Sequence, residues 1–312
     1  MIKTFGNNIY VVMYHYVRNI KKSKYPNLKG LEFSDFKEQI LYFKKNFNVL
    51  SNFQFIKIIN SKKIPKKKSV FLTFDDGYID HYQYVFPFLK KQNISANFYP
   101  PVMCIKNKKV LDVNKIHLIL EKEKNREKLL SLIFYYVKKF LNKNSEQIEL
   151  NKINLSSRYD DKNTILIKRL LQSHLPLKIR EKIVQKIFSD IVNIGEEEYS
   201  KELYMNTSNI QELYKNNFSI GSHGYNHFWW NKLNKNEQEN EIKKSINYFK
   251  KINVYDKNFS VCFPYGSYDI KTLDLLRKYD IKFALTTKEG KINKKNIHNI
   301  FELPRYDTND FK

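Results

Sequence analysis

Short apolar runs and segments of helical periodicity alternate along the first and last thirds of the chain. The apolar runs are rich in β-branched and aromatic residues, which is typical of buried strands. Seven of them begin near residues 9, 69, 95, 218, 259, 282 and 300. Strands that alternate with helices form a parallel sheet, so we expect an α/β protein. In the helix predicted over residues 234–251, Glu237 and Glu241 are expected on the outer face.

The positions of the polar residues favour a closed (β/α)7 barrel over an open sheet. The chain has no glycine fingerprint of the dinucleotide-binding fold. In a parallel α/β barrel, the active site lies at the carboxyl ends of the strands. The polar side chains that stand at these ends are His15, Asp75, Asp76, His223, Tyr265 and Arg305. We therefore expect the site on this rim.

The middle of the chain has a different pattern. Residues 106–202 are helical in periodicity, rich in Lys and Glu and poor in Gly. We predict a helical insertion lobe here, and a barrel built from residues 1–105 and 203–312. The stripe over 128–141 is amphipathic with basic flanks, a pattern that also suits a membrane surface. Packing on neighbouring helices is the more common role, and we expect it.

The composition is strongly basic, with 56 Lys or Arg against 32 Asp or Glu and a formal net charge of +24 in 312 residues. This charge fits a polyanion or an anionic membrane surface. The lysines are spread along the chain with abundant Asn and Ile, as in an AT-rich genome. We therefore expect no nucleic-acid partner and attribute the positive charge to the background composition. Peripheral contact with the inner membrane is an open alternative.

The compartment is predicted from the cysteines and the amino-terminal residues. Cys104 and Cys262 have no metal-type spacing, which indicates a reducing compartment. No early apolar stretch is long enough for a signal peptide or a transmembrane segment. These features predict a cytoplasmic protein. The oligomeric state does not follow from them.

The strongest chemical signal is a pair of carboxylates at the end of a buried strand. The apolar run 69–74 stops on Asp75 and Asp76, whose like charges repel unless a cation lies between them. His223 and His227 also follow a predicted strand, four residues apart. Two histidines and one carboxylate with an open position suit a hydrolytic metal. Such donors fit Zn²⁺, with Co²⁺, Ni²⁺, Mn²⁺ and Fe²⁺ as alternatives.

Three motifs resemble those of the polysaccharide deacetylase family, also known as the NodB homology domain or carbohydrate esterase family 4. They are Thr-Phe-Asp-Asp-Gly at 73–77, His-x-x-x-His at 223–227 and Phe-Pro-Tyr-Gly at 263–266. The resemblance implies a distorted (β/α)7 barrel. It also implies that a metal-bound water attacks an acetyl carbonyl. Asp75 is then the general base, with Asp76, His223 and His227 as metal ligands and the amide of Tyr265 at the oxyanion.

The chain departs from the family pattern at two catalytic positions. Cys262 stands where many members have an arginine, and Arg305 is a candidate to orient Asp75 instead. There is no Leu-x-His motif near the carboxyl terminus to supply the general acid. His15 is our candidate for that acid, because the chain is similar to a subgroup with an amino-terminal Tyr-His. The alternative is that His15 only ends its strand.

The resemblance implies a hydrolase that removes an acetyl group from an N-acetylated sugar of a glycan or a glycan precursor. We expect a lipid-linked or nucleotide-linked sugar as the precursor. The side chains expected to bind the sugar are Tyr78, Pro264, Trp229 and Trp230. The alternatives are an O-acetyl esterase or other C–N hydrolase on the same barrel, and a non-catalytic glycan-binding protein.

Overall fold

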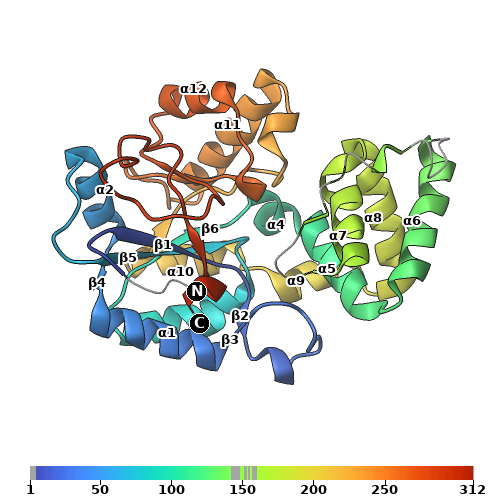
Figure 1. Ribbon diagram of the computed structural model, residues 1–312, viewed down its shortest axis with the longest axis horizontal. Coiled ribbons are helices and arrows are strands. Elements are labelled where there is room, and N and C mark those ends of the chain that lie inside the picture. Colours follow the sequence, from blue (N-terminus) through green and yellow to red (C-terminus); the bar gives the residue numbers. More distant parts are fainter. Residues whose placement is uncertain (1–4, 142–147, 151–152, 154, 157–159, 312) are drawn as a thin grey trace. The chain divides into compact units, whose positions relative to one another are not determined.

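A computed structural model gives the fold of residues 5–141, 148–150, 153, 155–156 and 160–311 (Figure 1). The chain forms two compact units. The first contains Met1–Ser23, Lys29–Lys109 and Ser200–Lys312, and the second contains Lys24–Leu28 and Val110–Tyr199. None of the helices in the described residues is long and apolar enough to cross a membrane. The cytoplasmic location stays a prediction.

The first unit alternates strands and helices. Its amino-terminal part contains β1 (Ile9–Tyr14), β2 (Val17–Arg18), β3 (Leu31–Glu32), α1 (Phe33–Asn46), β4 (Asn48–Val49), α2 (Asn52–Ser61), β5 (Ser69–Asp75), a π-helical turn (His81–Val85), α3 (Phe86–Lys91), β6 (Asn97–Tyr99) and α4 (Val102–Asn107). Its carboxyl-terminal part contains α10 (Thr207–Lys215), β7 (Ser219–Ile220), α11 (Lys235–Lys251), β8 (Val261–Cys262), α12 (Ile270–Lys278), β9 (Ala284–Leu285) and β10 (Tyr306–Asp307).

The main sheet is parallel and has the order β10-β1-β5-β6-β7, and β4 also pairs with β5. β4 pairs with the first two residues of β5, and β6 pairs with the last three. The parallel pair β8–β9 is joined to this order by two parallel bridges, Ser222 with Val261 and Leu285 with Leu303. The α/β class and the parallel sheet predicted from the sequence are confirmed.

Both faces of the strands are buried, which explains their almost continuous apolar sequences. Along β5, Val70, Leu72 and Phe74 belong to one hydrophobic cluster, and Phe71 belongs to another. The second cluster also contains Ile9 and Val11 of β1, Tyr99, Cys262, Leu285 and Leu303. Because side chains alternate along a strand, Thr73 and Asp75 lie on the same face as Phe71. Asp75 is therefore directed to the side that Cys262 occupies.

The second unit is helical. It contains α5 (Asp112–Lys122), α6 (Arg126–Leu141), α7 (Lys162–Arg169), a π-helical turn (Leu170–His174), α8 (Leu177–Val192) and the start of α9 (Glu196–Leu203). The stripe expected to pack inward on α6 does so, since Leu129, Ile133 and Val137 are buried.

Candidate functional site

The register of β1 and β5 brings the first two candidate residues together. Tyr14 lies opposite Phe74 in this parallel pair. The residues that follow, His15 and Asp75, therefore lie at the same carboxyl edge of the sheet. His15 is close enough to Asp75 to contribute to the lowering of its pKa.

Asp75 forms a bidentate ion pair with Arg305. Nη1 of Arg305 donates to Oδ1 at 3.0 Å and Nη2 donates to Oδ2 at 2.8 Å, and both residues are at most 2% exposed. Arg305 also donates from Nε to the carbonyl of Thr286 at 2.8 Å, which holds the guanidinium in place. Burial is the largest single effect and raises the pKa of Asp75. The charge and hydrogen bonds of Arg305, together with His223 and His15, outweigh it and keep that pKa below its ordinary value.

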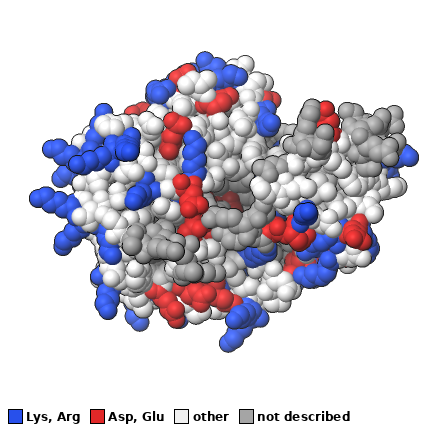
Figure 2. Space-filling model, viewed as in Figure 1, with Lys and Arg blue, Asp and Glu red and all other residues white. Residues whose placement is uncertain are grey.

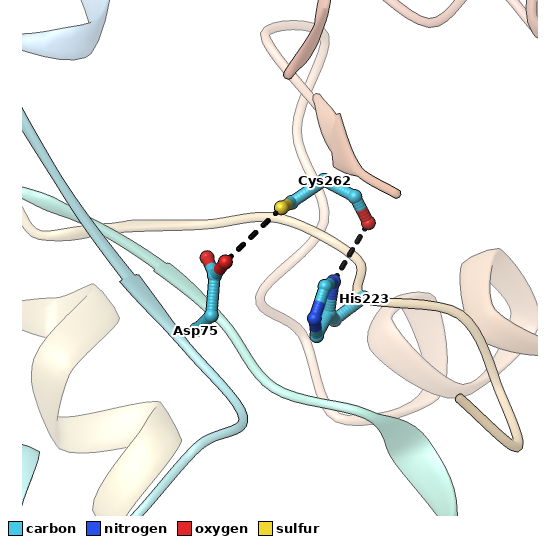
Figure 3. A group of neighbouring side chains, drawn as sticks. All are labelled: Asp75, His223 and Cys262. Carbon is cyan, nitrogen blue, oxygen red and sulfur yellow. Dashed lines mark hydrogen bonds between the residues drawn. The ribbon is translucent and has the colours of Figure 1, made fainter. Parts of the chain in front are cut away.

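Cys262 also contacts Asp75 and orients a histidine (Figure 3). Its thiol donates to Oδ2 of Asp75 at 3.3 Å, and burial raises the pKa of this thiol well above its ordinary value. The Cys262 carbonyl accepts a hydrogen bond from Nδ1 of His223 at 2.8 Å. The proton of His223 is therefore on Nδ1, and Nε2 keeps a free lone pair.

Asp76, His223 and His227 form a buried group of the kind that holds a metal ion. Oδ1 of Asp76 lies 3.5 Å from Nε2 of His223 and 3.4 Å from Nε2 of His227. Burial lowers the pKa of His223 to about 4 and that of His227 to about 3, so both imidazoles are neutral near pH 7. Within the described part of the chain, Oδ1 has no hydrogen-bond partner. A carboxylate oxygen that faces an imidazole lone pair without a proton between them fits a divalent cation.

The other oxygen of Asp76 is held by Tyr78, whose hydroxyl donates to Oδ2 at 2.7 Å. The Tyr78 ring stacks on Tyr16 at 4.1 Å and on Tyr204 at 5.9 Å, and it is 1% exposed. Tyr78 was expected to bind substrate, and this is wrong for its ring, which is enclosed by the two tyrosines. Its hydroxyl instead fixes which oxygen of Asp76 faces the histidines.

Glu241 of α11 holds the loop between the two histidines. Its carboxylate accepts hydrogen bonds from the backbone N–H groups of Tyr225 and Asn226, at 2.9 and 2.8 Å, and from Nδ2 of Asn226 at 2.6 Å. Glu241 is only 3% exposed, so the expectation that it lies on the outer face of its helix is wrong. Gly224 has a φ of +76°, and a Cβ there would lie 3.1 Å from Oε2 of Glu241. This contact and the left-handed backbone account for the glycine after His223.

The two tryptophans lie in different environments. Trp229 is partly exposed and stacks on Tyr265, with ring centroids 4.5 Å apart and an interplanar angle of 8°. The ring of Tyr265 lies 4.7 Å from that of His227, which places this aromatic pair beside the histidines. Trp230 is 0% exposed and packs on Phe263, so its expected role in sugar stacking is wrong.

Pro264 and His81 are two further buried residues near the site. Pro264 is buried and begins the turn that carries Tyr265. His81 is completely buried, and its Nε2 donates to the carbonyl of His15 at 2.8 Å. Burial lowers the pKa of His81 to about 3. This hydrogen bond positions the backbone at the end of β1, where His15 begins the following segment.

A sequence model described as polysaccharide deacetylase matches residues 62–110 and 186–284. These stretches contain the Asp pair, the His pair and Cys262, but neither His15 nor Arg305. No curated protein matches the chain.

Several solved structures have a similar fold. The deacetylase PplD of Streptococcus pyogenes in complex with acetate is 18% identical, with a TM-score of 0.57 over 97% of this chain and 93% of that one. IcaB from Ammonifex degensii is 14% identical, with a TM-score of 0.58 over 97% and 93%. The BpsB deacetylase domain from Bordetella bronchiseptica is 14% identical, with a TM-score of 0.54 over 97% and 96%. At these identities the likeness concerns the fold alone.

Proposed function

Because this chain belongs to the polysaccharide deacetylase family of enzymes, we propose that it is a metal-dependent hydrolase that removes the acetyl group from an N-acetylated sugar. The observation that carries the proposal is the buried group of Asp76, His223 and His227 beside the ion-paired Asp75. The substrate is a glycan, or a lipid-linked or nucleotide-linked precursor of one.

The proposed metal is zinc, held by Asp76, His223 and His227. When bound there, it supplies Lewis acidity that polarises the acetyl carbonyl and makes a water molecule more acidic. The chain prepares this group in two ways. The Cys262 carbonyl fixes the tautomer of His223, and Tyr78 directs Oδ1 of Asp76 toward the two imidazoles.

Asp75 is the proposed general base, and its hydrogen bonds indicate which oxygen takes the proton. A carboxylate has about four lone-pair sites. Arg305 uses one site on each oxygen, and the Cys262 thiol uses the second site of Oδ2. The remaining site is on Oδ1, so we assign proton transfer from the attacking water to this atom. Arg305 keeps Asp75 ionised and restricts its orientation.

His15 is the proposed general acid for the leaving amine, and the Tyr265 amide is the proposed donor to the oxyanion. Both roles are supported by the positions of the two residues. His15 lies near Asp75, and Tyr265 lies beside His227 with a φ of +58°. The exposed edge of the Trp229–Tyr265 pair is the proposed contact for the apolar face of a sugar ring.

We also propose that the parallel strands close into a distorted (β/α)7 barrel and that residues 106–202 are inserted into it. The support for closure is the pairing that continues from β7 through β8 and β9 to Leu303, three residues before β10, which pairs with β1. This closure would place all seven strand ends around Asp75.

The direct test is acetate release from N-acetylglucosamine oligomers and from lipid-linked and nucleotide-linked N-acetyl sugars. O-acetylated versions of the same sugars distinguish an esterase from an amidase. We expect release from an N-acetylated sugar by zinc-loaded protein. Release from O-acetylated sugars alone would overturn the proposed bond type.

A further inference from the structure

Two segments of the first unit carry many lysines and no acidic residue. Residues 39–74 and 290–301 contain no Asp or Glu, although these make up 32 of the 312 residues. Neither segment contains arginine. In the sequence the two segments are far apart, so each on its own reads as part of a lysine-rich background.

The fold brings these segments together at the amino ends of β1 and β5. Ile9 and Ile292 exchange two backbone hydrogen bonds, of 3.1 and 2.9 Å. On the other side, the N–H of Ser69 donates to the carbonyl of Asn8 at 2.9 Å. Ile64, in the loop between α2 and β5, packs against the cluster that contains Ile292 and Ile297. The loop after α2 and residues 290–298 therefore meet on one side of the sheet.

The lysines gathered here are exposed and, among the described residues, make no ion pair. The first segment contributes Lys57, Lys62, Lys63, Lys66 and Lys67. The second contributes Lys291, Lys294 and Lys295. We call these eight residues the amino-end lysine surface. Figure 2 shows Lys and Arg side chains gathered on the side where Figure 1 draws α2.

Lysines elsewhere in the first unit are often neutralised locally. Lys278 pairs with Glu239 at 2.6 Å, and Lys282 pairs with Asp280 at 2.6 Å. The amino-end lysine surface has no such acidic neighbours in its own segments. The repulsion among these lysines is therefore screened by solvent and counterions. An external polyanionic surface would take the place of the counterions.

An exposed aromatic side chain stands at the edge of this surface. Phe53, in the first turn of α2, is 68% exposed and lies one helical turn before Lys57. An apolar ring beside lysines is typical of proteins that lie on lipid headgroups. Lysine is a compact point charge, which suits a diffuse anionic surface, whereas bidentate recognition of single phosphates favours arginine.

We propose that the amino-end lysine surface binds an anionic lipid bilayer, with Phe53 entering the headgroup region. β5 runs for seven residues from this side to Asp75, a span of roughly 20 Å at about 3.3 Å per residue. The proposed catalytic groups stand at the opposite ends of the strands. A protein bound in this way turns its catalytic rim away from the lipid, toward glycan chains.

The test is co-sedimentation of the full chain with vesicles of phosphatidylcholine, with and without phosphatidylglycerol. The patch variant replaces Lys62, Lys63, Lys66 and Lys67 with Gln. The matched control replaces Lys232, Lys235, Lys243 and Lys271 with Gln; these lysines are exposed, lie outside both segments and have the same total charge. Each lysine near an anionic surface contributes about a fivefold increase in partitioning. We therefore expect partitioning of the patch variant to anionic vesicles to fall by about a hundredfold or more, and that of the control by less than about threefold.

A Phe53→Ser variant separates lipid from a soluble polyanion. It keeps the charge, and we expect about tenfold weaker vesicle binding, with binding to soluble polyphosphate unchanged. Equal loss in the patch variant and the matched control would overturn the proposal, because net charge alone would then explain binding. So would absence of binding to anionic vesicles, or vesicle binding that is unchanged in Phe53→Ser. No hydrolysis is measured, so this test is independent of the proposed deacetylase activity.

Discussion

Arg305 and Asp75 are 230 residues apart in the sequence and form a buried bidentate ion pair, with N–O distances of 3.0 and 2.8 Å. The arginine comes from the segment before β10, and the aspartate ends β5. Parallel pairing of both strands with β1 brings them together. Cys262 contacts the same carboxylate through a neutral thiol, and Arg305 supplies the counter-charge.

The first prediction concerns this pair. Arg305→Ala leaves Asp75 buried without its counter-charge, so the free energy of unfolding is expected to fall by about 3–5 kcal/mol. The pKa of Asp75 should rise, because burial then dominates. The acid limb of the pH profile of kcat/KM should move to higher pH. Arg305→Lys keeps a charge without the bidentate fork and should fall between wild type and Arg305→Ala in both measurements. An unchanged acid limb in a folded Arg305→Ala protein would contradict the assigned base.

The second prediction concerns metal binding and Tyr78. Tyr78→Phe removes the hydroxyl that holds Oδ2 of Asp76 but keeps the stacked ring. Loss of such a supporting hydrogen bond typically weakens metal affinity by about 10–100-fold. Competition with a chromogenic zinc chelator measures this directly. Tyr204→Phe is the control, since Tyr204 stacks on the same ring. Equal affinities in the two variants would show that the hydroxyl has no such role.

The third prediction compares two glutamates of α11. Glu241→Ala removes three hydrogen bonds to the loop between His223 and His227, and should lower the free energy of unfolding by about 2–4 kcal/mol. It should also weaken zinc binding, because the loop is released. Glu237→Ala removes an exposed capping-box contact to Asn234 and should cost about 1 kcal/mol or less, with zinc binding unchanged. Urea denaturation and chelator competition test both statements, and similar zinc affinities would argue against the loop support.

The fourth prediction is the pH dependence of stability in metal-free protein. Burial lowers the pKa of His81, His223 and His227 from 6.5 to about 3, 4 and 3. Between these values and 6.5, the unfolded chain binds more protons than the folded one. The stability contribution of the neutral histidines is therefore complete above pH 6.5 and is lost progressively as the pH falls toward 4.

Urea midpoints of chelator-treated protein from pH 7.5 to 4.5 measure this loss. In His81→Phe the dependence should be shallower by up to one proton, whatever the stability change at pH 7.5. A midpoint that stays constant over this range in the wild type would contradict the assignment of neutral, buried histidines.

Local patterns in the sequence were sufficient to predict most strands and the grouping of Asp76 with His223 and His227. Apolar runs reveal buried strands, and polar residues at their ends reveal the rim, so Asp75, His223 and Arg305 could be placed there from spacing alone. The short strands β2, β3 and β4 were not predicted, because each has two residues and, unlike β7 to β10, lies outside the apolar runs from which strands were predicted.

The misplaced residues depend on packing by distant segments. Glu241 was assigned to solvent because a glutamate on an amphipathic helix is usually exposed. It is buried because the backbone of the 225–226 turn supplies its donors. Trp230 adjoins Trp229 in sequence, but only Trp229 keeps an exposed edge, since Trp230 turns onto Phe263. No pattern local to either residue contains this information.

The most direct test of the central claim is acetate release by zinc-loaded wild type and Asp75→Asn, with zinc binding measured for both. We predict that the wild type releases acetate from an N-acetylated sugar, and that Asp75→Asn binds zinc but loses activity by about a hundredfold or more. Full activity in a zinc-loaded Asp75→Asn protein would contradict the assigned base. Failure of the folded wild type to bind zinc or another divalent cation would contradict the site itself.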